Sequence, residues 1–251
     1  MIDFKGQTVL ITGGSRGIGA SAAKLFADYG ANVVINYNQD ESSARQVLEQ
    51  SETNSGSARI YKADIADNDQ CRKMVDWTVD QFGGLDIVVN NAGIWKESAI
   101  EDMTPEKLAE TVNCNLNGCF YITTAAVPYM KKQKSGNIVF VSSTAGQRGE
   151  AFHSHYAATK GALISLTKSL ALELAPYNII VNCVAPGWVD TDMSHEIIVS
   201  EDGPKHLSLI PLGRAATPEE IAWPILFMAS GLASFITGEI LNVNGGAVLA
   251  G

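Results

Sequence analysis

The chain has 251 residues, of which 46% are hydrophobic, and a formal net charge of −9 at pH 7. This length and apolar content suit one large α/β domain with a substantial core, and the negative charge argues against nucleic acid as a main partner. No apolar run reaches the ~18 residues that a membrane-spanning helix needs, so no membrane partner is expected either.

Apolar runs typical of buried strands alternate with helical patterns along the chain. Strands are predicted at 8–12, 32–37, 58–63, 85–90, 137–142, 179–184 and 239–244, and helices near 17–29, 40–51, 67–82, 106–132 and 154–175. This alternation predicts a doubly wound parallel sheet of the Rossmann type, with about seven strands and helices on both faces. Because no repeat, linker or low-complexity segment interrupts it, residues 1–251 are expected to form a single domain.

The first predicted strand runs into a glycine-rich turn and then a helix. The glycines fall at positions 13, 14, 17 and 19. Gly13 can take a tight turn that other residues avoid, and Gly17 and Gly19 let the chain approach a pyrophosphate closely. The free N–H groups at the start of the helix favour phosphates. The pattern therefore predicts a dinucleotide-binding site.

A second group of residues predicts hydride-transfer chemistry. Tyr156 and Lys160 are four residues apart in a helical pattern, so both side chains project from one face. An ammonium group near a phenol stabilises the phenolate and lets a tyrosine exchange protons at neutral pH. Ser143 follows a buried strand and can hydrogen-bond a substrate carbonyl oxygen beside Tyr156. Ser142 should point to the opposite side of that strand.

Motifs spread over essentially the whole chain make it similar to the short-chain dehydrogenase/reductase family. Thr12–Gly19 fits the family's TGxxxGxG loop, and Asp64 fits the acidic residue that contacts the adenine. Asn90–Gly93 fits NNAG, and Pro186–Thr191 fits the PGxxxT segment that holds the nicotinamide carboxamide. The family's four catalytic positions are matched by Asn115, Ser143, Tyr156 and Lys160.

The resemblance implies a dinucleotide-binding and catalytic domain that interconverts a carbonyl and a secondary alcohol with NAD(P)(H). Tyr156 would be the general acid and base, Ser143 would steady the substrate oxygen, and Lys160 would also bind the nicotinamide ribose. Asn115 would hold a water that links Lys160 to solvent. The residues expected to bind the cofactor are Gly13, Ser15, Arg16, Gly17, Ile18, Gly19, Asn36, Tyr37, Asn38, Asp64, Ile65, Asn91, Ala92, Gly93, Tyr156, Lys160, Pro186, Gly187, Val189 and Thr191.

The residues after the second strand favour NADP(H) over NAD(H). An NAD enzyme usually has Asp or Glu at the end of this strand, but the first carboxylate here is Asp40, after Asn36, Tyr37 and Asn38. Arg16 in the glycine loop suits a 2′-phosphate. The basic residue that often follows this strand is missing, so NAD(H) stays open.

The segment 188–214 is too long for an ordinary connection, which favours a lid over the substrate rather than a disordered insertion. The candidate substrate-binding residues are Ser143, Tyr156, Trp95, His153 and Trp188. The aromatic rings among them suit an apolar or ring-bearing substrate. They could equally pack in the core or against another subunit.

Within the family, the overall pattern most resembles 3-oxoacyl-(acyl carrier protein) reductases, which implies an NADPH-dependent ketoreductase of fatty acid biosynthesis. NVVINYNQDE, LGRAATPEE and FITGEILNVNGG carry this likeness. Lys131, Lys132 and Lys134 could form a basic patch for the acidic acyl carrier protein, but Tyr177 stands at a second position that is commonly basic. The alternatives are a dehydrogenase of a sugar, polyol, cyclic alcohol or steroid-like substrate, and a non-catalytic NADP(H)-sensing protein.

The family resemblance also implies a homotetramer in which the helices near 106–132 and 154–175 pair across subunits. The apolar runs 218–230 and 243–251 can bury another interface or pack inside the subunit. The four cysteines lack C-x-x-C spacing and are expected to be buried free thiols, and no metal site is expected. Since the first strand begins within ten residues of the start, we expect no signal peptide and a cytoplasmic location.

Overall fold

The computed structural model describes residues 2–52 and 56–249. Its core is a seven-stranded sheet in the order β3-β2-β1-β4-β5-β6-β7, in which all neighbouring strands are parallel. The prediction of a doubly wound parallel sheet is therefore confirmed, and each predicted strand matches an observed one with ends within two residues. The strands are β1 (Thr8–Ile11), β2 (Asn32–Tyr37), β3 (Ser57–Lys62), β4 (Ile87–Asn90), β5 (Gly136–Val141), β6 (Ile179–Pro186) and β7 (Ile240–Val243).

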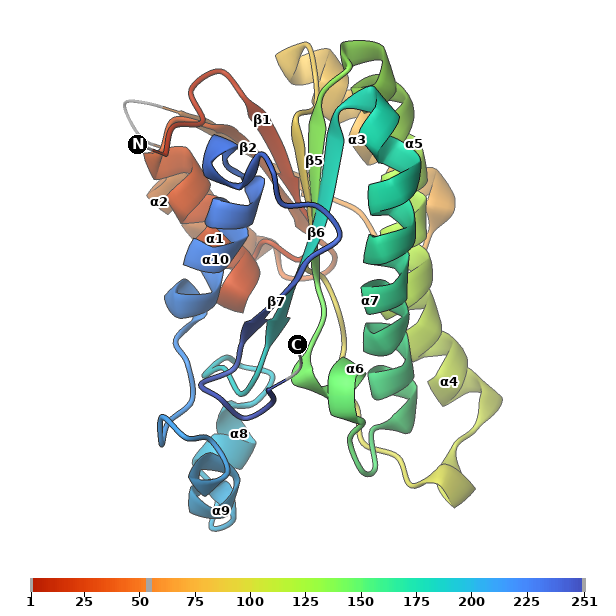
Figure 1. Ribbon diagram of the computed structural model, residues 1–251, viewed down its shortest axis with the longest axis vertical. Coiled ribbons are helices and arrows are strands. Elements are labelled where there is room, and N and C mark those ends of the chain that lie inside the picture. The colour runs from red at the N-terminus through yellow and green to blue at the C-terminus, as the bar shows by residue number, and fades with distance from the viewer. Residues whose placement is uncertain (1, 53–55, 250–251) are drawn as a thin grey trace.

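Helices cover both faces of the sheet (Figure 1). One face carries α1 (Gly17–Asp28), α2 (Glu41–Ser51) and α10 (Pro218–Ala229), and the other carries α3 (Asn68–Phe82), α5 (Gly118–Gln133) and α7 (Ser154–Leu174). Each layer buries its own apolar cluster against the central strands, which are apolar on both sides as expected of parallel strands between helices. The shorter helices are α4 (Pro105–Val112), α6 (Thr144–Arg148), α8 (His195–Ile198), α9 (Gly203–Ser208) and η1 to η4 (Ile100–Asp102, Asn113–Asn117, Ala175–Tyr177 and Gly231–Ala233).

The helix predicted at 106–132 is not continuous. The π-helical turn η2 separates α4 from α5, and Asn115 lies in the middle of this turn. A π-turn adds one residue to a helical turn and is frequent at functional sites. The residue pattern does not predict this turn, because the surrounding residues follow an ordinary helical period.

Helix α10 was seen in the sequence only as the apolar run 218–230. Thr217 and Glu220 form a reciprocal capping box, and Pro218 occupies the first turn. Most apolar side chains of α10 are buried in the cluster that α1 shares, so this run packs largely inside the subunit. The second run, 243–251, includes residues 250 and 251, which lie outside the described residues.

Within the described ranges, no helix is long and apolar enough to cross a membrane. In the same residues, no cluster of three or more His, Cys, Asp or Glu side chains is placed to hold a metal ion. The four cysteines are free thiols, as predicted, and three of them are buried.

Candidate active site

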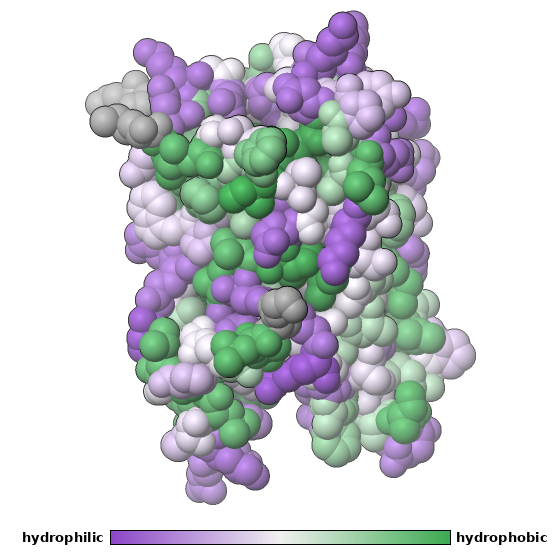
Figure 2. Space-filling view, in the orientation of Figure 1, coloured by the Kyte–Doolittle hydropathy of each residue, from purple (hydrophilic) through white to green (hydrophobic). Residues whose placement is uncertain are grey.

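One cavity of about 1020 Å³ lies at the carboxyl ends of the parallel strands. Ligands of open α/β sheets bind at this edge, and the volume lies at the upper end of the ~300–1000 Å³ range that is usual for small-molecule sites. Figure 2 shows the surface hollowed between the segment that bears α8 and α9 and the segment around α6. Met193 lines the cavity from the first segment and Glu150 from the second.

The glycine loop is held tightly against the start of the NNAG segment. Thr12 Oγ1 accepts the N–H groups of Asn91 (3.0 Å) and Ala92 (3.1 Å), and Asn91 Nδ2 donates to the carbonyl oxygens of Thr12 and Gly13 (3.0 and 3.1 Å). A Cβ atom on Gly19 would lie 2.3 Å from the carbonyl oxygen of Gly13. Gly19 must therefore remain glycine for α1 to start this close to the loop.

Two further glycines give the loop its shape. Gly13 and Gly17 have φ angles of 61° and 54°, which favour glycine. A Cβ on Gly17 would lie 3.2 Å from Cγ2 of Thr191, which also lines the cavity. The loop thus exposes backbone rather than side chains beside the helix start, which is the arrangement that a pyrophosphate needs. The residues present fit a dinucleotide.

The side chain of Asn36, at the end of β2, is hydrogen-bonded to the glycine loop. Its side chain is buried, its Oδ1 accepts from the Gly13 N–H (3.2 Å), and its Nδ2 donates to the carbonyl oxygen of Ala63 (3.0 Å). Asn36 lines the cavity, but its amide is already engaged on both sides. These bonds arise because an inward-facing polar side chain in a buried strand must find partners inside the fold, and a cofactor contact of Asn36 stays a prediction.

The neighbouring residue, Tyr37, is also mostly buried. Burial raises the pKa of the Tyr37 hydroxyl, and the Glu41 carboxylate raises it further. Glu41 in turn interacts with Arg45, which lowers the pKa of that carboxyl. Asp40, which precedes Glu41, is the acidic residue that lines the cavity where β2 ends.

The structure brings Ser143, Tyr156 and Lys160 together in the cavity. Ser143 caps α6 and its Oγ accepts from the Ala145 N–H (3.1 Å), which leaves the hydroxyl proton available to another oxygen. Lys160 Nζ donates to the Val141 carbonyl oxygen (2.7 Å) and lies 5.7 Å from the centre of the Tyr156 ring. An ammonium group has three protons to donate, so Lys160 keeps donors for a ligand.

The hydroxyl groups of Ser142 and Ser143 have different partners, although both residues line the cavity. The Ser142 Oγ donates to the Lys160 carbonyl oxygen (2.7 Å) and is buried between β5 and α7. This bond fixes the turn of α7 that carries Lys160. The Ser142 hydroxyl thus holds α7, whereas the Ser143 hydroxyl caps α6.

Asn115 does not line the cavity but lies directly behind it. Its Oδ1 accepts from the Ile94 N–H (2.8 Å) and its Nδ2 donates to the Ile94 carbonyl oxygen (2.9 Å). A Cβ on Gly93 would lie 3.4 Å from both Asn115 Oδ1 and Lys160 Nζ. Asn115 therefore fixes the NNAG segment beside Lys160, and its expected role in holding a water stays a prediction.

Aromatic rings form one wall of the cavity, and they come from three segments. Trp95 and Trp188 line the cavity, with ring centroids 5.8 Å apart in an edge-to-face contact. His153 does not line it, because its ring stacks behind Trp95 at 4.4 Å. His206 of α9 packs against Trp188 at 5.3 Å. The segment 188–214 thus contacts the rest of the site through the aromatic pair Trp95–Trp188.

Most of the other predicted site residues also line the cavity, with Gly19 set behind the loop. Sequence reasoning missed several lining residues that lie between or beside its motifs: Gln39, Asp40, Ile94, Lys96, Glu110, Asn113, Cys114, Ala145, Arg148, Glu150, Asp192 and Met193. Arg148 and Glu150 could have been found, because they lie between Ser143 and Tyr156 in the sequence. Glu110 and Asn113 could not, because only the course of α4 and η2 brings them to the cavity.

Comparison with known proteins agrees with this fold. A family model described as enoyl-(acyl carrier protein) reductase matches residues 13–248. The chain is 39% identical to a 3-oxoacyl-[acyl-carrier-protein] reductase of Thermotoga maritima, over 98% of this chain and 99% of the relative. It is 38% identical to a 3-oxoacyl-[acyl-carrier-protein] reductase of a Synechocystis species, over 99% of this chain and 100% of the relative.

A solved structure also has a very similar fold. The crystal structure of a short-chain dehydrogenase/reductase named as a glucose/ribitol dehydrogenase, from Brucella melitensis, matches with a TM-score of 0.92 and 34% identity, over 99% of both chains. The chain therefore belongs to the short-chain dehydrogenase/reductase family. It is a reductase that acts on CH–OH groups with NAD(P).

Proposed function

We propose that the protein is an NADPH-dependent ketoreductase that reduces 3-oxoacyl thioesters, in the manner of a 3-oxoacyl-(acyl carrier protein) reductase of fatty acid biosynthesis. The observation that carries the proposal is the joint lining of one cavity by Ser143, Tyr156, Lys160 and the glycine loop. Two full-length relatives at 38–39% identity bear that enzyme name. The matching family model is described as an enoyl reductase. Two hydroxyl groups facing one cavity suit a carbonyl oxygen better than a carbon–carbon double bond.

Each catalytic residue has its own role in the proposed reaction. The reduced nicotinamide supplies a hydride to the carbonyl carbon when it is bound. Ser143 donates a hydrogen bond to the carbonyl oxygen, and Tyr156 gives its proton to that oxygen as it becomes an alkoxide. Lys160 stabilises the phenolate that remains and binds the nicotinamide ribose. Asn115 holds a water through which the proton is replaced from solvent.

The cofactor would lie along the glycine loop with its adenine near Asp64. Asp64 Oδ1 accepts from the Ala66 N–H (2.9 Å), which fixes the carboxylate at the cavity edge. Pro186, Gly187, Val189 and Thr191 would hold the nicotinamide end. NADP(H) is favoured because Arg16 borders the cavity, and NAD(H) is the alternative.

Acyl carrier protein is a proposed partner, but the lysine patch is distant from the cavity. Lys131 and Lys132 lie in the last turn of α5 and Lys134 follows it, next to the start of β5, whereas Ser143 follows the other end of β5. A six-residue strand spans roughly 20 Å at ~3.3 Å per residue. Lys131 Nζ also lies 4.3 Å from the centre of the Tyr177 ring, which occupies part of the patch.

A dehydrogenase of a sugar, polyol, cyclic alcohol or steroid-like substrate is the second candidate. The aromatic wall of Trp95 and Trp188 favours it, because flat rings offer good surfaces for stacking. The similar structure named as a glucose/ribitol dehydrogenase points the same way. The segment 188–214 would act as the lid over either substrate, and a cytoplasmic location goes with either role.

The test is steady-state oxidation of NADPH and NADH with an acetoacetyl thioester. A crotonyl thioester, a panel of cyclic and aromatic ketones, and the matching alcohols and sugars with NADP and NAD are assayed beside it. Fast NADPH-dependent reduction of the acetoacetyl thioester supports the proposal. Faster turnover of a ring compound would replace it with the second candidate, and binding of NADPH without any turnover would favour a sensing protein.

A further inference from the structure

An ion pair crosses the mouth of the cavity between the glycine loop and the start of the lid segment. Arg16 Nη1 lies 3.5 Å from Asp192 Oδ2. Both residues line the cavity, and both side chains are largely exposed, so a ligand can reach either of them. Arg16 is the residue on which the proposed preference for NADP(H) depends. Its existing partner therefore matters for that preference.

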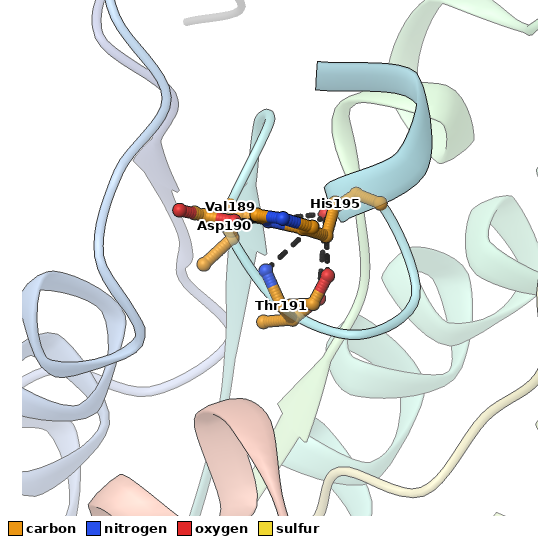
Figure 3. Close-up of polar contacts among 5 residues, drawn as sticks. Val189, Asp190, Thr191 and His195 are labelled. Carbon is orange, nitrogen blue, oxygen red and sulfur yellow. Dashed lines mark hydrogen bonds and ion pairs between the residues drawn. The ribbon is translucent and has the colours of Figure 1, made fainter. Parts of the chain in front are cut away.

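Asp192 lies in a turn that is stabilised by polar contacts among its own residues (Figure 3). Asp190 Oδ1 lies 2.8 Å from His195 Nδ1, and the His195 N–H donates to the Thr191 carbonyl oxygen (2.8 Å). Ser194 Oγ donates to the Val189 carbonyl oxygen and accepts from the Thr191 N–H. These contacts stabilise the backbone on both sides of Asp192. The carboxylate is thus presented to Arg16 from a defined position.

The charges around Arg16 are mostly negative. Among the cavity-lining residues of the glycine loop and of β2 with the turn after it, all within the described part of the chain, Arg16 carries the only positive charge. Asp40 borders the same part of the cavity, and the pKa of its carboxyl is lowered by hydrogen bonds from Ser43 and, to a smaller extent, by the attraction of Arg16. A bound phosphate would therefore depend on Arg16 while meeting Asp40 and Asp192 as repelling groups.

We propose that Asp192 sets cofactor selectivity by competing with the 2′-phosphate of NADP(H) for Arg16. The proposal rests on the proposed use of this cavity for NAD(P)(H). A 2′-phosphate must displace Asp192 from Arg16 before it can pair with the guanidinium. NAD(H) has an uncharged 2′-hydroxyl and requires no displacement. Asp192 therefore weakens the binding of NADP(H) and leaves NAD(H) nearly unaffected.

The test is the dissociation constant of NADP and NAD for the full chain, measured by titration calorimetry, which needs no substrate and no turnover. Asp192→Asn keeps the size of the side chain and removes its charge. We expect it to tighten NADP binding about two- to fivefold, the range for releasing a partly exposed ion pair, and to leave NAD binding unchanged. Asp190→Asn is the matched control, because it lies in the same turn but pairs with His195 rather than Arg16.

Arg16→Ala and the double variant Arg16→Ala/Asp192→Asn complete a double-mutant cycle for NADP binding. Arg16→Ala should weaken NADP binding, and in that background Asp192→Asn should change NADP affinity less than it does when Arg16 is present. An unchanged ratio of NADP to NAD affinity in Asp192→Asn would overturn the proposal, as would equal changes for both cofactors or the same shift in Asp190→Asn. If the ratio shifts as expected but no carbonyl compound is reduced, the proposed function fails and the role of Asp192 stands.

Discussion

At the scale of single residues, the site depends on hydroxyl groups whose neighbours fix their direction. The Ser143 Oγ accepts from the Ala145 N–H, so its proton is the part that is left to contact a substrate. Ser143→Ala removes this donor while alanine keeps the backbone of the cap. We expect kcat to fall roughly 10²–10³-fold, the usual effect of losing one hydrogen-bond donor to a developing oxyanion. Titration of NADPH should show unchanged binding, and a loss of cofactor affinity instead would place Ser143 in the cofactor site.

The cysteine thiols give a residue-scale prediction that depends on pH. Burial raises the pKa of Cys71 and Cys119 to about 12, and of Cys114 and Cys183 to about 11. The pKa of a cysteine thiol in an unfolded chain is about 8.5. Because the folded values are raised, the stability linked to these thiols is fully present below the unfolded pKa and is lost as the pH rises toward 11–12.

The measurement for the thiols is reaction with an aromatic disulfide reagent at pH 8, before and after unfolding in denaturant. We expect slow reaction in the native state and four reactive thiols per unfolded chain. Cys114 should react first because it lines the cavity, and NADPH should slow that reaction. Rapid labelling of all four thiols in the folded protein would contradict the burial described here.

At the scale of secondary-structure elements, the close contact between the glycine loop and α1 constrains the cofactor site. A Cβ on Gly19 would lie 2.3 Å from the Gly13 carbonyl oxygen and 2.6 Å from Asn91 Nδ2. Gly19→Ala must therefore push the loop away from α1, at a typical overpacking cost of about 1–3 kcal/mol. We expect Tm to fall by roughly 2–10 °C and NADPH binding to weaken with it.

Gly231→Ala is the control for this prediction. Gly231 has no neighbouring atom within 4 Å of the added Cβ, and it lies outside the cavity. Its replacement should change Tm and NADPH affinity little. Equal effects of the two substitutions would show that the loop tolerates a side chain at position 19.

The same scale shows which elements the sequence could predict. Strands such as β5 and β6 are continuous apolar runs, because parallel strands are buried on both faces, and such runs are visible without any tertiary information. Helix α10 was missed although Thr217 and Glu220 carry a capping signature, because its apolar residues and internal Pro224 obscure the helical period. The π-turn η2 arises from tertiary contacts of Asn115 with Ile94, which no local pattern encodes.

The candidate site was predictable for a related reason. Gly13, Ser143, Tyr156 and Lys160 belong to motifs with fixed spacing, and the ends of parallel strands must meet at one edge. The engaged amide of Asn36, the position of His153 behind Trp95, and the Arg16–Asp192 pair were not predictable. Each depends on how side chains from distant segments pack, rather than on spacing along the chain.

At the scale of the whole molecule, apolar side chains remain exposed on surfaces that a homotetramer would cover. Figure 2 shows hydrophobic residues gathered over the centre of one face, where Figure 1 has β7 and α10. Phe235 near that region is fully exposed, and Leu172 on α7 is 82% exposed. Exposed apolar surface of this kind is typical of subunit interfaces.

We therefore expect light scattering at micromolar concentration to give the mass of four chains. Leu172→Lys places a charge on the α7 surface and should shift the mass toward smaller assemblies. Lys168→Ala, on the same helix, is the control that keeps the apolar surface. A monomer for the unaltered protein would contradict the tetramer and require another explanation for the exposed residues.

The whole account depends on Tyr156 as the group that exchanges a proton with the substrate oxygen. The most direct measurement is the single-turnover rate of NADPH oxidation by Tyr156→Phe, beside the unaltered protein, with the best substrate from the panel. We expect the rate to fall roughly 10²–10⁴-fold, the usual contribution of a general acid, with unchanged NADPH affinity and unfolding midpoint. A near-normal rate for this folded, cofactor-binding variant would contradict the assignment of the active site.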